Sequence, residues 1–137
     1  MPKINPLLAM NLFCAVVLGL LALCSAQDEH VMHICEAVEP KIIGTYKASN
    51  DKTDGVPVYV NQNEMSFFRS RGYWYLGNLA PWPPETHYRC VELEGCNEGL
   101  DYPPSTEEGL WSVAKNFGQE PVPIISKTSC AVVSDEL

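Results

Sequence analysis

Basic residues are scarce in this chain. Its 137 residues include nine lysines and arginines against seventeen aspartates and glutamates, so the formal net charge is −8. A protein that neutralises phosphate groups or docks on an anionic membrane surface needs the opposite balance. We therefore exclude nucleic acid as a partner, and we expect no membrane association once the leader described below has been removed.

Catalytic motifs and helical periodicity are lacking as well. The chain has no nucleophile motif and no Cys-x-x-Cys redox pair, and His87 near Glu85 is the acid–base pair considered for hydrolysis. No long segment places apolar residues at helical spacing, and eleven prolines with nine glycines disfavour long helices. We therefore expect a chain with no catalytic residue, no cofactor and no metal, and a small hydrolase is the least favoured function.

The first 26 residues predict a signal peptide. An apolar run over 7–23 follows Lys3 and ends at the small residues Cys24-Ser25-Ala26, which a signal peptidase recognises. The run is shorter than the roughly 20 apolar residues that a membrane span needs. We expect cleavage after Ala26, and the alternative is an uncleaved anchor helix.

The last residues, 131–137, form a tail that ends in a retrieval-like tetrapeptide. Ser134-Asp135-Glu136-Leu137 resembles the signals of soluble endoplasmic reticulum proteins, typified by Lys-Asp-Glu-Leu. The resemblance implies a retrieval receptor as a partner and the lumen of the endoplasmic reticulum as the location. The alternative is an extracellular protein whose final tetrapeptide is accidental.

Four cysteines remain after removal of the leader: Cys35, Cys90, Cys96 and Cys130. An even number in an oxidising compartment predicts two disulfides, and four cysteines allow three connectivities. We favour Cys35 with Cys130, which joins the beginning of the folded region to its end, and Cys90 with Cys96, which closes a short loop through Glu94-Gly95. A zinc site that combines these cysteines with His33 and His87 is disfavoured, because the spacings do not match the usual paired ligands.

After a short lead over 27–41, the segment 42–130 is expected to form an aromatic-rich β domain. Its apolar and β-branched segments predict strands at 42–46, 56–60, 65–69, 73–76, 88–93, 109–114 and 122–125. Turn residues at 48–55, 62–64 and 70–72 leave connections so short that neighbouring strands run antiparallel. The predicted fold class is mainly β: a small single-domain antiparallel meander or sandwich stapled by two disulfides. A brief helix over 106–114 is the alternative for that segment, because Ser105 is able to cap it.

Aromatic residues supply the candidate ligand site. In Tyr73-Trp74-Tyr75 neighbouring side chains point to opposite faces of a strand, so the three rings cannot all enter one core. Trp82 lies in Pro81-Trp82-Pro83-Pro84, where proline holds the connector extended. Arginine guanidinium groups stack on such rings or hold a carboxylate. Trp74, Trp82 and Arg71 are therefore the predicted ligand-binding residues, with packing into the core as the alternative for the rings.

These features lead to two main functional hypotheses. The first is a non-enzymatic binding module of the endoplasmic reticulum lumen that takes a glycan, a peptide or a client protein. The second is a secreted, disulfide-stapled effector, such as an inhibitor or a matrix component. Both need a protein or glycan partner, and they differ in the role of the final tetrapeptide.

Overall fold

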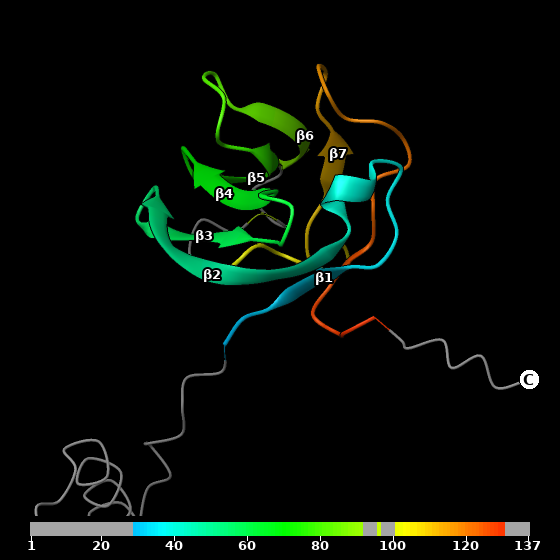
Figure 1. Ribbon diagram of the computed structural model, residues 1–137, viewed down its shortest axis with the longest axis horizontal. Helices are drawn as coiled ribbons and strands as arrows, with labels where there is room; N and C mark the ends of the chain where they lie inside the picture. Colours follow the sequence, from blue (N-terminus) through cyan, green and yellow to red (C-terminus); the bar gives the residue numbers. More distant parts are fainter. Residues whose placement is uncertain (1–28, 92–95, 97–100, 131–137) are drawn as a thin grey trace, which may run out of the picture.

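The computed structural model describes residues 29–91, 96 and 101–130, which form one curved antiparallel sheet (Figure 1). In chain order the elements are β1 (Met32–Ile34), the 3-10 helix η1 (Pro40–Ile42), β2 (Gly44–Thr53), β3 (Val56–Val60), β4 (Ser66–Ser70), β5 (Tyr73–Asn78), β6 (Glu85–Cys90), β7 (Trp111–Val113) and β8 (Ile125–Ser126). The expected signal peptide, the C-terminal tail with its tetrapeptide, and the Glu94-Gly95 turn lie outside the described residues.

The strand order is β7-β6-β5-β4-β3-β2-β1-β8, and every neighbouring pair is antiparallel. Strands β2 to β6 follow one another in the chain and in the sheet, which is a meander. The sheet curls into a half-barrel (Figure 1). By the strand order its edge strands are β7 and β8. The predicted fold class is confirmed in its meander form: mainly β, a small single domain, with two disulfides.

Strand β2 is longer than the sequence suggested. A loop was expected over 48–55, but β2 continues to Thr53 and only Asp54-Gly55 makes the turn. The second half of β2 is largely exposed and polar, so it carries no apolar alternation for a sequence pattern to detect. It is held by pairing with β3 from Lys47↔Val60 to Thr53↔Val56, with an irregularity in register between Ala48 and Lys52.

One further segment differs from expectation, and at another the structure decides between the two alternatives in favour of the expected strand. The range 27–41, expected as a lead, contains β1, which pairs with β2 and β8 and buries Met32 and Ile34 completely. A three-residue strand is too short to show periodicity, which is why the sequence did not reveal it. Over 106–114 no helix forms: the Ser105 carbonyl accepts the amides of Glu108 and Gly109 in a single turn, and β7 follows.

Both predicted disulfides are confirmed, each with Cα atoms 5.6 Å apart. Cys35–Cys130 is exposed and lies next to β1, whereas Cys90–Cys96 is fully buried. Because all four sulfurs are paired, none offers a thiolate to zinc. Disulfides of this kind are typical of proteins of the secretory pathway or the extracellular space. No helix among the described residues is long and apolar enough to cross a membrane.

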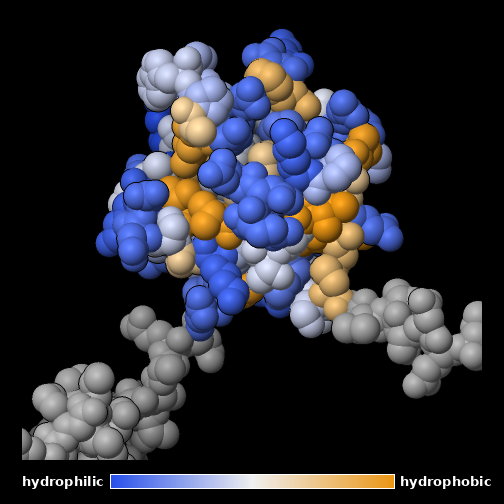
Figure 2. Space-filling view, in the orientation of Figure 1, coloured by the Kyte–Doolittle hydropathy of each residue, from blue (hydrophilic) through white to orange (hydrophobic). Residues whose placement is uncertain are grey.

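The concave side of the sheet holds the hydrophobic core. Tyr46, Phe67, Trp74 and Tyr88 are its largest aromatic members, and the Tyr46 and Phe67 rings meet edge to face with centroids 4.7 Å apart. The Tyr46 hydroxyl donates to the Ile42 carbonyl, so this buried polar group is satisfied. Hydrophilic side chains predominate on the face seen in Figure 2, and apolar ones appear between them in separate groups.

Candidate functional site

Two hairpin turns lie side by side at one end of the sheet. The β2–β3 turn has positive φ at Asp54 (52°) and Gly55 (77°), and the β4–β5 turn has positive φ at Arg71 (53°) and Gly72 (84°). Positive φ at both central residues is the pattern of type I′ turns, whose twist matches that of the flanking strands. The two turns therefore share one backbone geometry but present an aspartate and an arginine at the same position.

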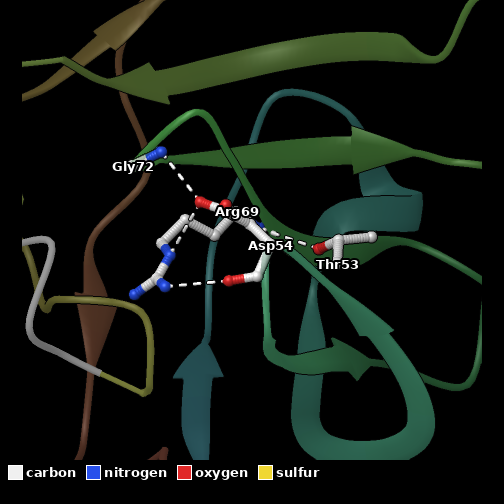
Figure 3. A network of polar contacts seen from close by, with 4 residues as sticks. All are labelled: Thr53, Asp54, Arg69 and Gly72. Carbon is white, nitrogen blue, oxygen red and sulfur yellow. Dashed lines mark hydrogen bonds and ion pairs between the residues drawn. The ribbon is translucent and has the colours of Figure 1, made fainter.

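Asp54 joins the two turns through a polar network (Figure 3). Its Oδ2 accepts hydrogen bonds from Arg69 Nε at 3.1 Å and from the Gly72 amide at 2.8 Å, and its carbonyl accepts from Arg69 Nη2 at 2.9 Å. Thr53 Oγ1 accepts the Arg69 amide at 3.2 Å. The Gly72 hydrogen bond, followed by the hydrogen bond and charge of Arg69, holds the pKa of Asp54 below its usual value.

The outer, convex face of β4 and β5 is covered by the connection between β5 and β6. Phe67 enters the core, so Phe68 points outward, where it is 5% exposed and stacks on Tyr75 with centroids 5.6 Å apart. Leu79, Trp82 and Pro84 of the connection line a cavity of about 460 Å³ together with Phe68. The connection therefore folds back over the strands that it joins.

Arg71 and Trp82 both line this cavity, which we name the Trp82 cavity and define by Phe68, Arg71, Leu79, Trp82 and Pro84. The Asp54–Arg69 pair also borders it. The Trp82 side chain is 90% exposed, and Arg71 is exposed and forms no hydrogen bond or ion pair with any described residue. An aromatic ring and a cationic group are thus both accessible at the mouth of one hollow.

The structure brings together two of the three predicted ligand-binding residues. Trp74 is the exception, because it is fully buried in the core, where its ring meets Tyr59 at a centroid distance of 6.2 Å. Alternation along β5 was a sound basis for placing Trp74 opposite Tyr73 and Tyr75, but the face that it occupies is the interior. The role of Asp54 was not foreseen, and its signal in the sequence was the Asp-Gly pair that marks the first turn.

A second cavity, of about 370 Å³, holds His87 with Glu85 and Glu39. Burial lowers the pKa of His87, and the two carboxylates oppose that shift. Of the described residues that line this cavity, none is a serine, threonine or cysteine. The hydrolase hypothesis therefore finds no nucleophile beside its candidate base.

A third hollow, of about 580 Å³, is an apolar groove beside the Cys35–Cys130 disulfide. Val38 and Ile124 are its exposed aliphatic residues, and Glu36 is its one charged residue. It offers apolar contact but few groups that would orient a ligand.

No protein-family model, no curated protein and no solved structure matches this chain. The functional information therefore comes from its own geometry. The Trp82 cavity combines an aromatic ring that is 90% exposed with an accessible arginine. The His87 cavity also has an exposed ring and an exposed cation, Phe117 and Lys41, but it holds the carboxylates of Glu39 and Glu85 beside them.

Proposed function

We propose that the protein is a non-enzymatic binding module of the secretory pathway and that it holds a glycan, a peptide or a client protein at the Trp82 cavity. The observation that carries this proposal is the 90% exposure of Trp82 beside Arg71. A tryptophan usually buries most of its large apolar surface, and exposed tryptophan and arginine side chains are enriched among residues that dominate binding energies. The core of the half-barrel does not need this ring.

The proposed location is the lumen of the endoplasmic reticulum, with retrieval through Ser134-Asp135-Glu136-Leu137. The second candidate is a secreted effector, which the exposed Cys35–Cys130 disulfide would suit equally. Adding residues after Leu137 separates them: masking the free carboxyl terminus would release a retrieved protein to the medium and leave the distribution of a secreted one unchanged.

Binding is tested by co-purifying partners with a chain tagged after Ala26 and expressed in the secretory pathway. We expect Trp82→Ala to weaken partner capture by about 1 to 3 kcal/mol, the range of an interface hot spot. Ile124→Ala is the matched control, because Ile124 is also an exposed apolar residue but lies outside the Trp82 cavity. Equal capture by the wild-type chain and Trp82→Ala would contradict the proposal.

A further inference from the structure

Among the described residues that line the Trp82 cavity, there are two arginines and one aspartate, on a protein that is acidic as a whole. Arg69 and Asp54 form an ion pair at its border, so their charges offset each other, and Arg71 adds one positive charge. The chain as a whole carries a formal net charge of −8. A positive charge in a hollow on such a surface selects ligands that place a negative charge at that point.

The backbone of Arg71 is unusual for a long side chain, a feature that Glu64, with φ of 64°, shares among the described residues. Its φ of 53° lies in the left-handed region, where asparagine, aspartate and glycine are favoured over a long side chain. In the neighbouring turn Asp54 occupies the same position, and its hydrogen bonds to Arg69 and Gly72 give it a structural role. Arg71 has no such role among the described residues. The positive φ of Arg71 is unfavourable, and no contact among the described residues explains it. Together with the position of Arg71 at the cavity, it points to a role in function.

The site does not suit a peptide that binds as an added strand, and its volume fits a compact ligand. Peptides commonly bind by adding a strand to a free sheet edge. Strands β4 and β5, which carry Phe68 and border Arg71, each have a neighbouring strand on both sides, so the site has no such edge. The cavity of about 460 Å³ is within the range of small-molecule sites.

We propose that the Trp82 cavity binds a sugar that bears a carboxylate, such as a terminal sialic acid or a hexuronic acid. The apolar face of the sugar ring lies on the exposed indole of Trp82, and the carboxylate takes paired hydrogen bonds from the Arg71 guanidinium, whose planar fork matches it. This inference rests on the proposed binding function and adds the ligand class.

The test measures dissociation constants of the oxidised mature chain for 3′-sialyllactose and for a disaccharide that ends in glucuronic acid. Lactose and the corresponding glucose-terminated disaccharide are the neutral probes. We expect at least one acidic sugar to bind tenfold or more tightly than its neutral counterpart. Arg71→Gln and Trp82→Ala should each weaken that binding at least tenfold. Arg89→Gln should not, because Arg89 is exposed on β6 but does not line the cavity.

Arg71→Gly guards against misfolding as an explanation, since glycine suits the positive φ of this turn; it should lose binding as Arg71→Gln does. Equal affinity for acidic and neutral sugars, or no effect of either Arg71 variant, would overturn the carboxylate assignment. Binding of an acidic peptide but of neither sugar would overturn the sugar assignment. Both results leave the proposed function standing if partner capture still depends on Trp82, whereas capture that is independent of Trp82 contradicts the proposed function itself.

Discussion

The interior of the half-barrel and the Trp82 cavity on its outside each centre on one tryptophan. Trp74 is fully buried among core aromatic rings, and Trp82 is 90% exposed beside a cation. The same side-chain chemistry stabilises the fold in one region and stays available to a partner in the other. The difference shows that strand alternation assigns rings to opposite faces, whereas the curvature of the sheet and the path of its connections decide which rings are covered.

The largest expected effect concerns the two disulfides. It tests whether the buried or the exposed disulfide contributes more to the free energy of unfolding. The chain-entropy model gives about 4.7 kcal/mol for a ring as large as that of Cys35–Cys130 and roughly 2.4 kcal/mol for the ring of Cys90–Cys96. Sequence separations are 95 and 6 residues. We expect Cys→Ala replacement of the exposed pair to cost more free energy of unfolding than replacement of the buried pair.

Denaturant unfolding of the two double variants measures this difference. Removal of the buried sulfurs also removes packing contacts in the core. This loss reduces the expected difference in free energy of unfolding between the two variants. A greater loss from the Cys90–Cys96 variant would mean that packing in the core outweighs the constraint on the unfolded chain, and the contrast between interior and surface would then extend to the disulfides.

The next effect compares the two tryptophans directly. Trp74→Ala should lower the free energy of unfolding by about 3 to 5 kcal/mol, because it empties a large site in the core. Trp82→Ala should change it by no more than about 0.5 kcal/mol, as for other exposed positions. Urea unfolding of both variants provides the measurement. A comparable loss from Trp82→Ala would show that this ring stabilises the fold and would count against its place in the proposed binding site.

The smallest effect concerns the Asp54 network at the border of the Trp82 cavity. The pKa of Asp54 is lowered in the folded protein, chiefly by the Gly72 amide. Its contribution to stability is therefore present above the pKa of the unfolded chain, near 4, and is lost as pH falls through the lower folded value. We expect Asp54→Asn to flatten the acid limb of the unfolding midpoint plotted against pH.

Asp51→Asn is the matched control for that experiment, because Asp51 is exposed on β2 and its carboxylate takes no part in the network. An acid limb that Asp51→Asn changes as much as Asp54→Asn would show that general surface charge, rather than the joined turns, sets the pH dependence.

The sequence was informative where local pattern and final structure coincide. Alternation over 56–60 and 73–76 identified strands, and the positions of Cys35 and Cys130 at the two ends of the folded region identified a pair. It failed at β1, which is three residues long, and in the second half of β2, whose exposed side chains need not alternate. Strand β1 and the second half of β2 are both defined by hydrogen bonding to neighbouring strands. A local sequence pattern does not show such pairing.

The candidate site was only partly predictable for a similar reason. Arg71 precedes β5 and Trp82 follows it, so a flat hairpin would separate them by the length of that strand. The connection that carries Trp82 folds back onto Phe68, and this brings both residues to one cavity. Their types suggested binding, but their proximity depends on a loop path that no local pattern encodes.

The Cys35–Cys130 disulfide also has a mechanical consequence. A pulling force applied to the chain on either side of this pair passes through the sulfur bridge, and the 94 residues between the two cysteines bear no load. The oxidised domain is then a short, inextensible link. Once the bridge is reduced and the sheet is unfolded by the force, those residues extend, and at about 3.3 to 3.6 Å per residue they span roughly 310 to 340 Å. The length to which this domain can be stretched thus depends on the redox state of one exposed bond.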